Sequence, residues 1–152
     1  MVPKIKIMIQ NADFHVDTEI KELSQNQLGT GAVTVFLGLV RDLSARNELK
    51  YIELEHYPGM TEKALHEICL EAVRRWKING ITVIHRIGRL SPGENIVLVL
   101  VSAKHRREAH LSSEFIMDFL KSKVPIWKKE TSASDSKWIS VRESDSTSLT
   151  RW

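Results

Sequence analysis

An uninterrupted apolar run at residues 96–101 constrains the fold more than any other part of this sequence. Most of its residues are β-branched, and a run of this kind is typical of a strand that is buried on both faces of a sheet. Other elements must then cover both faces of that sheet. The run therefore predicts a central strand in a layered protein of helices and strands.

The segment that follows this strand is predicted to form a largely buried helix over residues 106–123. At 100° per residue, its apolar side chains cover a broad arc and leave one narrow polar strip. The strip consists of His110, Glu114, Asp118 and Lys121. The helix should stop before Pro125, because the residue before a proline is excluded from the α conformation. A short extended piece at 126–128 would bring Lys128 back toward Lys121.

Cationic side chains stand at both ends of this helix. His105, Arg106 and Arg107 mark its start, where unpaired backbone N–H groups already favour an anion. Near its end, Lys121 has an ordinary explanation, in which it pairs with Asp118 one turn back and favours the helix C-terminus. In that explanation Lys128 and Lys129 are solvated charges, and residue patterns alone favour it over an anion site.

The rest of the chain alternates between shorter strands and helices. We expect strands at 4–9, 32–40, 51–57, 81–87 and 137–142, helices at 17–25 (capped by Asp17 or Thr18) and 60–77, and a polar tail at 143–152. Asn79 and Gly80 are expected to lead into the strand at 81–87. The order β-α-β-β-α-β-β-α-β-β indicates an α+β fold, and 152 residues are enough for one domain with a real core.

Five single residues have two explanations each. Gly38 marks either a bulge or a close backbone approach, or simply a weakly packed strand. Arg41, at the end of that strand, either points at a ligand or solvates a loop. Cys69 is predicted to be a core residue rather than a reactive thiol, and His85 a buried, hydrogen-bonded histidine. Trp152 either contacts another subunit or lies in a frayed terminus, and the sequence favours fraying.

The charge distribution excludes some classes of function. Residues 1–103 hold 12 Lys/Arg and 12 Asp/Glu, and residues 104–152 hold 10 and 7, so the net charge of +3 arises in the last third. This excess is too small for a general nucleic-acid binder and suits a small anionic ligand or an acidic protein tail. The six histidines show no metal-binding spacing, and no glycine fingerprint for phosphate follows a strand. We therefore expect no metal or cofactor. With no signal segment, no apolar membrane span and a single cysteine, we expect a cytosolic protein.

Several separated motifs occur together and in order. They are LEHYPGM at 54–60, HRIG at 85–88, SAKHR at 102–106, DFLK at 118–121 and PIWKKE at 125–130. In this combination the sequence closely resembles the large, catalytic subunit of molybdopterin synthase, from about Gly31 to Arg142. The loop after Arg41 lacks a glycine expected for that family, and His110 stands in place of a phenylalanine.

The resemblance implies an α/β hammerhead-like fold with a small antiparallel β subdomain, which is one form of the α+β class. It implies a homodimer flanked by two copies of a small ubiquitin-like sulfur-carrier subunit, together a heterotetramer. Such enzymes add two sulfurs to cyclic pyranopterin monophosphate, which gives the dithiolene of molybdopterin. The sulfur arrives as a thiocarboxylate on the carrier's C-terminal Gly-Gly tail, and no cofactor or metal takes part.

The resemblance also implies roles for particular residues. Lys121 matches the principal catalytic lysine and Lys128 a second one. Residues that match substrate-binding positions are Leu39, Val40, Arg41, His105, Arg106, Lys121, Lys128, Lys129 and Glu130, and Arg142 matches an arginine of the anion pocket. Both reactants are anions, so such a pocket needs fixed cations and a proton donor but no protein nucleophile.

Two other classes of function remain open at this point. A non-catalytic scaffold would bind the tail of a ubiquitin-like partner, and its function would survive Lys121→Ala. A nucleic-acid-binding module would use the basic stretch 121–129, with Trp127 stacking on bases, and its binding would weaken steeply with salt. The nearly neutral overall charge already argues against this second class.

Overall fold

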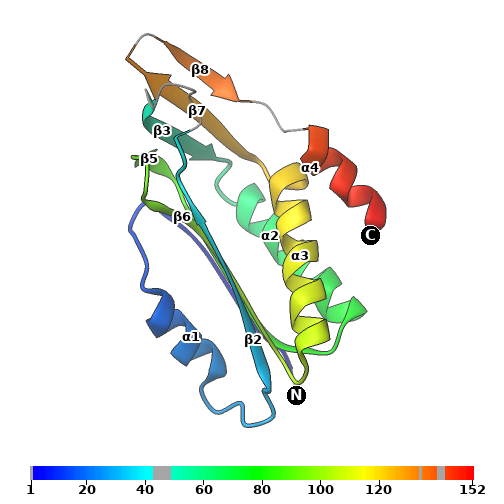
Figure 1. Cartoon of the computed structure of the whole chain (residues 1–152). Coiled ribbons are helices and arrows are strands. Elements are labelled where there is room, and N and C mark those ends of the chain that lie inside the picture. The colour runs from blue at the N-terminus through cyan, green and yellow to red at the C-terminus, as the bar shows by residue number, and fades with distance from the viewer. Residues whose placement is uncertain (1, 43–48, 134, 140–142) are drawn as a thin grey trace.

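Two four-stranded sheets organise the protein (Figure 1). The structure, a computed structural model, describes residues 2–42, 49–133, 135–139 and 143–152. The larger sheet is flanked by helices, and the smaller sheet lies beyond one end of it. This arrangement of helices with a second, antiparallel sheet confirms the predicted α+β class.

The larger sheet has the strand order β1-β4-β6-β2. Its strands are β1 (Lys4–Gln10), β4 (Ile78–Arg86), β6 (Asn95–Ala103) and β2 (Ala32–Leu39). β1 runs parallel to β4, and the other neighbours are antiparallel. The predicted central strand is confirmed, because β6 lies inside the sheet and its residues 97–101 are at most 1% exposed.

Helices cover both faces of this sheet (Figure 1). Val97, Val99 and Val101 of β6 belong to the core cluster shared with α2 (Met60–Arg75) and α3 (Arg106–Lys123). The intervening Leu98 and Leu100 belong to the cluster under α1 (Val16–Ser24). Since side chains alternate between the faces of a strand, a continuous apolar run is what two covered faces require.

The smaller sheet is wholly antiparallel, in the order β5-β3-β7-β8. Its strands are β5 (Gly88–Leu90), β3 (Leu49–His56), β7 (Ile126–Ser132) and β8 (Ser136–Ile139). A separate small core of Val40, Ile52, Leu54 and Leu90 lies beneath it. The short strand β5 was not predicted, and residues 140–142 of the predicted last strand lie outside the described residues.

Element boundaries agree best where the periodicity is strongest. α3 spans the predicted residues 106–123, whereas α2 ends at Arg75, two residues earlier than predicted. The predicted caps of α1 are wrong, because His15 stands at the N-cap and no side chain caps the helix. β4 starts at Ile78, three residues earlier than predicted, so it includes Gly80, at a point where the register with β6 shifts.

The polar tail is also more ordered than predicted. It forms α4 (Glu143–Ser148) and a 3-10 turn, η1 (Leu149–Arg151). Trp152 packs edge-on against Trp76 and Phe115, at centroid distances of 5.7 and 5.5 Å, and its indole Nε1 donates a hydrogen bond of 2.6 Å to Asp118. The predicted fraying is therefore wrong, because the indole covers the edge of the core between α2 and α3 while its N–H finds a carboxylate.

Candidate active site

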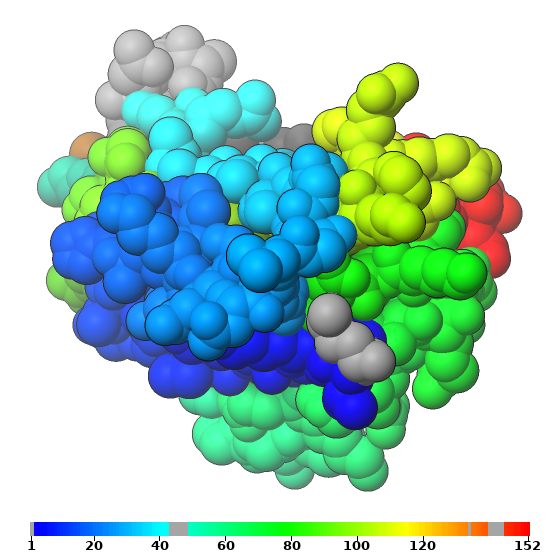
Figure 2. Space-filling model, turned by 90° about the horizontal axis from the view of Figure 1, so that it is seen from below, coloured from blue at the N-terminus to red at the C-terminus, as the bar shows by residue number. Residues whose placement is uncertain are grey.

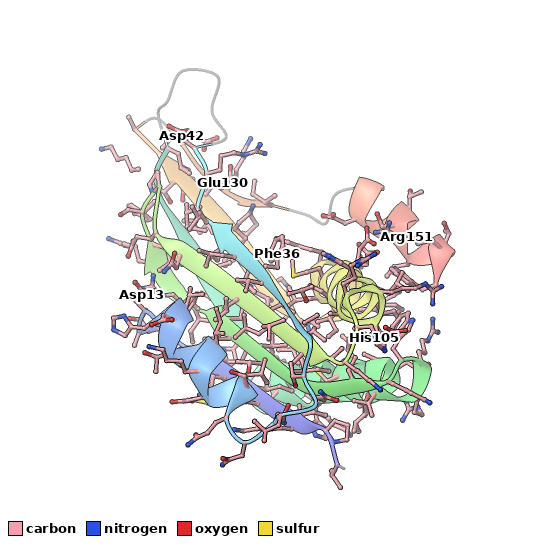
Figure 3. The ribbon with its side chains drawn as sticks, turned by 60° about the horizontal axis from the view of Figure 1, so that its bottom comes forward. Asp13, Phe36, Asp42, His105, Glu130 and Arg151 are labelled. Atoms are coloured by element: carbon pink, nitrogen blue, oxygen red, sulfur yellow. The ribbon has the colours of Figure 1, made fainter. Side chains whose placement is uncertain are left out.

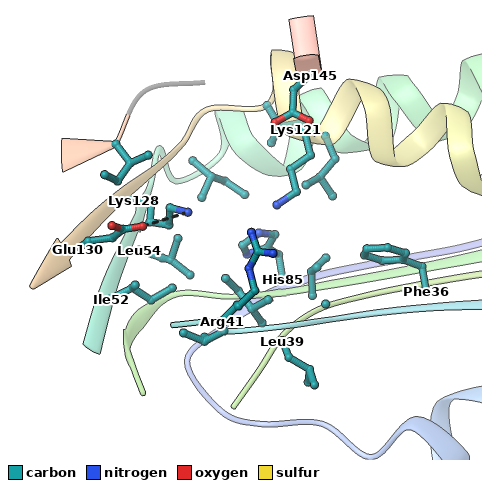
Figure 4. Close-up of a pocket in the computed structure, with 18 residues that line it drawn as sticks. Phe36, Leu39, Arg41, Ile52, Leu54, His85, Lys121, Lys128, Glu130 and Asp145 are labelled. Atoms are coloured by element: carbon teal, nitrogen blue, oxygen red, sulfur yellow. Dashed lines mark ion pairs between the residues drawn. The ribbon is translucent and has the colours of Figure 1, made fainter. Parts of the chain in front are cut away.

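A pocket of about 380 Å³ opens at the junction of the two sheets (Figure 4). It lies among the end of β2, the last turn of α3 and the inner face of β7. Its charged and titratable lining residues are Arg41, His85, Lys121, Lys128, Glu130 and Asp145, and its apolar lining includes Phe36, Leu39, Val40, Ile52, Leu54, Leu120, Val124 and Ile126. The sequence-predicted residues Leu39, Val40, Arg41, Lys121, Lys128 and Glu130 all line this one pocket.

A bulge next to Gly38 directs the end of β2 into the pocket. Gly38 pairs with Val97 but Leu39 pairs with Asn95, so Ile96 is the extra residue. A β-carbon on Gly38 would lie 2.7 Å from Val97 Cγ1, which only glycine avoids. The bulge, one of the explanations for this glycine, is confirmed. Beyond it, Val40 N–H donates to the Glu94 carbonyl at 2.9 Å and fixes the strand end that carries Arg41.

The turn between α3 and β7 brings the two lysines together. Lys121 lies in the last turn of α3, and β7 begins at Ile126, directly after Pro125. Side chains alternate along β7, so Lys128 shares the pocket face with Ile126 and Glu130. The predicted return of Lys128 toward Lys121 is confirmed.

Thr61 fastens this turn to the start of α2. Its hydroxyl is completely buried, donates a hydrogen bond of 2.9 Å to the Pro125 carbonyl and accepts one of 2.9 Å from the Tyr57 N–H. The hydroxyl therefore satisfies two backbone groups at once. Through Pro125, it sets where β7 starts relative to α3.

Cations outnumber carboxylates around the pocket. Arg41, Lys121 and Lys128 face Glu130 and Asp145. Lys128 Nζ lies 3.7 Å from Glu130 Oε1, which suffices for coulombic attraction but not for a hydrogen bond. The same oxygen is buried without a hydrogen-bond partner among the described residues. The ion pair between Lys128 and Glu130 is therefore weak. A ligand could hydrogen-bond to Lys128 without displacing a strong interaction.

His85 forms part of the pocket wall while being only 4% exposed. Its Nδ1 lies 2.7 Å from the Arg86 carbonyl oxygen. Burial lowers the pKa of His85 to about 4; the hydrogen bond with Arg86 opposes this change, and the positive charge of Lys121 adds to it. The predicted buried, hydrogen-bonded histidine is confirmed, and it is neutral near pH 7.

Two predicted binding residues lie far from this pocket. His105 and Arg106 are exposed at the start of α3, about 22 Å along the helix axis from Lys121. Figure 2 views the molecule from the end at which α3 starts, where this yellow-green turn projects from the surface, and Figure 3 shows His105 well separated from Glu130. One chain alone does not bring these residues to Lys121.

The two remaining predicted residues are Lys129 and Arg142. Lys129 alternates to the outer face of β7, with its Nζ 5.8 Å from the centre of the Trp138 ring. Arg142 lies outside the described residues. Asp118, the partner of Lys121 in the ordinary explanation, accepts hydrogen bonds from Arg151 and Trp152, and Lys121 points into the pocket.

Among the lining residues that sequence reasoning missed are Phe36, His85 and Asp145. A signal existed for His85. Ile81 and Val83 face the α2 and α3 side of the larger sheet, and alternation places His85 on that same face. No comparable signal exists for Asp145, because the tail that carries it shows no periodicity.

The described residues provide no other reactive centre. Cys69 is completely buried, and burial raises the pKa of its thiol to about 12, which confirms the predicted core role. Within the described ranges, no three His, Cys, Asp or Glu side chains are grouped to hold a metal ion. No helix in the described part of the chain is long and apolar enough to cross a membrane.

Comparison with known proteins identifies the family of this chain. The family described as "MoaE protein" matches residues 9–123. The molybdopterin synthase catalytic subunit of Haemophilus influenzae is 49% identical over 148 residues, which cover 97% of this chain and 98% of that protein. The molybdopterin biosynthesis MoaE protein of Burkholderia ambifaria superposes with a TM-score of 0.84 at 45% identity, over 97% of each chain. A molybdopterin synthase structure from Staphylococcus aureus gives a TM-score of 0.79 at 33% identity, over 92% of this chain and 99% of that one. The chain therefore belongs to the MoaE family of molybdopterin synthase catalytic subunits.

Proposed function

We propose that this chain is a sulfurtransferase that converts cyclic pyranopterin monophosphate to molybdopterin. The two dithiolene sulfurs come from the thiocarboxylated C-terminus of a small ubiquitin-like subunit. One observation carries the proposal most directly: Lys121 and Lys128, from different elements, line the same pocket as Arg41. Family membership supports the reaction, and the pocket supports the place where it occurs.

The pocket has the charge that this reaction requires. The pterin phosphate and the thiocarboxylate are both anions, so their approach is opposed unless fixed cations stand between them. Arg41 and Lys128 supply such charge, and Lys121 serves as the proton donor and acceptor beside the reacting sulfur. The thiocarboxylate brings its own nucleophile, so the buried Cys69 thiol is not needed.

The sulfur carrier's tail has an apolar approach to this site. Leu39 lines the pocket and is nevertheless 53% exposed, so it offers contact area at the rim. A flexible Gly-Gly tail without side chains needs little room to pass this rim. We therefore assign the small subunit as the partner that docks at the rim, and we place the complex in the cytoplasm.

His105 and Arg106 belong in this proposal through a second copy of the chain. At about 22 Å from Lys121, they cannot reach the substrate of their own pocket. They are exposed at a helix start, where the Arg106 guanidinium and the unpaired backbone N–H groups suit a phosphate held in a neighbouring subunit's pocket. Each active site of the proposed homodimer would then combine Lys121 of one copy with His105 and Arg106 of the other.

Reconstitution with purified components tests the reaction. Wild type with thiocarboxylated small subunit and cyclic pyranopterin monophosphate should yield dithiolene product, and Lys121→Ala should yield almost none while still binding the small subunit. Lys63→Ala, an exposed lysine on α2, is the matched control and should keep full activity. If wild type binds the small subunit but makes no product, the scaffold function replaces this one.

Mixed dimers test the shared site. One Lys121→Ala copy and one His105→Ala copy are assembled with different affinity tags and purified through both. If sites are shared, one of the two pockets keeps Lys121 and His105 intact, and about half of the wild-type activity remains. The His105→Ala homodimer is the control and should be inactive; if it keeps wild-type activity, His105 has no role in either pocket and the shared site is refuted.

A further inference from the structure

We propose that Arg86 is a positioning residue for the reaction: it fixes the turn at residues 91–94, and this turn holds the end of β2 that carries Arg41. The inference rests on the sulfur-transfer function proposed above, in which Arg41 supplies a fixed positive charge. Arg86 follows His85 on β4, and His85 lines the pocket. Since side chains alternate along a strand, Arg86 faces the other side of the larger sheet. It therefore acts on the pocket through the backbone and not by contact with the substrate.

The guanidinium of Arg86 joins two segments that are far apart in the sequence. Arg86 is only 7% exposed. Its Nε donates a hydrogen bond of 3.0 Å to the Asn11 carbonyl, just after β1, and its Nη1 donates one of 2.9 Å to the Asn95 carbonyl, where β6 begins. A planar guanidinium donates in two fixed directions at once, whereas a lysine ammonium group is a single point of charge. The two carbonyl groups are thus held at a set separation.

Two carboxylates balance the buried charge of Arg86. Glu94 Oε1 lies 3.5 Å from Nη1, and Asp13 Oδ1, beside the start of α1 (Figure 3), lies 4.0 Å from it. The second carboxylate oxygen of Glu94 accepts a hydrogen bond from the Ser91 N–H and so closes the turn. Asp13 Oδ1 accepts one of 3.0 Å from the side-chain amide of Asn95. A buried arginine is destabilising unless it is paired, so these contacts favour one arrangement of the turn.

The same turn is hydrogen-bonded to the end of β2 by two backbone groups. The Val40 N–H donates to the Glu94 carbonyl at 2.9 Å, and the Gly93 N–H donates to the Val40 carbonyl at 2.8 Å. Gly93 has a φ of +90°, a conformation that favours glycine. Arg41 follows Val40 directly, and Figure 4 shows its side chain in the cavity, directed toward Lys121. A displaced turn would therefore displace Arg41.

The charge of Arg41 depends on this support for its position. Arg41 is exposed, so packing does not fix its long side chain, and the place of its backbone decides where the guanidinium can reach. Stabilisation of a developing charge requires the cation to be in place before the reaction. A misplacement of about 1 Å can slow an enzyme about 100-fold.

Conservative substitutions separate the proposed role of Arg86 from its charge. Arg86→Lys keeps the buried positive charge and removes the pair of directed hydrogen bonds. Glu94→Gln removes the ion pair with Arg86 at a side chain that is 43% exposed, and it decides the question if Arg86→Lys does not fold. Arg74→Lys, at an exposed arginine of α2 paired with Glu71, is the matched control.

Amide hydrogen exchange, followed by NMR, tests the first step of the inference. In Arg86→Lys, the N–H groups of Val40 and Gly93 should exchange about tenfold faster or more, because the turn that protects them is loosened. The N–H of Val99, inside the larger sheet, should change little. Glu94→Gln should show a smaller change at the same two groups, and Arg74→Lys none.

A double-mutant cycle tests the second step. Single-turnover kcat/KM for the pterin substrate is measured with thiocarboxylated small subunit, with and without Arg41→Ala. Arg86→Lys should lower kcat/KM about fivefold or more when Arg41 is present. In the Arg41→Ala background the same substitution should lower it less than about twofold, since the group that Arg86 positions is already gone. Arg74→Lys should have no effect in either background.

Three results would overturn the inference. Unchanged exchange at Val40 and Gly93 would show that Arg86 does not hold the turn. Faster exchange with wild-type kcat/KM would show that the turn does not position Arg41. Equal losses with and without Arg41 would reduce Arg86 to a structural role. Each of these leaves the sulfur-transfer function standing, which fails only if wild type makes no product.

Discussion

Lowering the pH should destabilise this protein through His85 in a defined window. In the folded chain, burial holds the pKa of His85 at about 4, against 6.5 for an unburied histidine. Between these values the unfolded chain binds a proton that the folded chain does not, so the free energy of unfolding falls as the pH falls. By pH 4 this loss of unfolding free energy reaches about 3 kcal/mol, whereas above pH 7 the titration of His85 has no effect on stability.

Urea unfolding at a series of pH values between 7 and 4.5 measures this loss. Carboxylates also titrate toward the acid end, so the quantity of interest is the difference between wild type and His85→Gln, which cannot take up this proton. The two stabilities should converge as the pH falls, with the steepest change between about pH 6 and 4.5. Lys121→Met should flatten the wild-type dependence somewhat, because the lysine charge contributes to the low pKa. Parallel curves for wild type and His85→Gln would refute the argument that His85 is buried in its neutral form.

Four substitutions test other parts of the structure. Thr61→Val should cost about 2–3 kcal/mol in urea unfolding, since it leaves the Tyr57 N–H and the Pro125 carbonyl unpaired, and it should also lower kcat. Gly38→Ala should cost about 1–3 kcal/mol through the clash with Val97, whereas Gly29→Ala, which meets no atom within 4 Å, should be neutral. Trp152→Ala should cost about 2–3 kcal/mol and change the near-UV circular dichroism of the remaining tryptophans; an unchanged melting temperature would contradict the packing of the tail. Cys69→Ala should cost about 1 kcal/mol and leave kcat unchanged, and a thiol reagent should label the folded wild type only as fast as it unfolds.

The sequence predicted those parts of the fold in which one pattern of apolar residues continues over a long segment. The run at 96–101 required two covered faces, and α3 appeared over the predicted 106–123 because its apolar arc and Pro125 left one solution. The start of α1 was missed because no side chain caps it. The strand β5 was missed because three residues are too few to show an alternating pattern. The ordered tail was missed because its order comes from a tertiary contact of Trp152, which local sequence does not encode.

The candidate site shows the same division. Alternation along β7 was enough to bring Lys128 toward Lys121, and the resemblance supplied Leu39, Val40 and Arg41, which all line the pocket. The resemblance also placed His105 and Arg106 in one site with Lys121, but one chain holds them at opposite ends of α3. A residue pattern assigns roles to positions and does not say which copy of a chain supplies them.

The alternation along β7 also limits which changes of length the chain can accept. Lys128 faces the pocket because it lies two residues after Ile126, and Ile126 starts the strand directly after Pro125. Inserting or deleting one residue between Pro125 and Lys128 would turn Lys128 outward and present an indole or another side chain to the substrate. Many substitutions in this segment would leave that geometry intact. A one-residue change of length between Pro125 and Lys128 should therefore remove the Lys128 ammonium group from the pocket, even though the strand itself would still form.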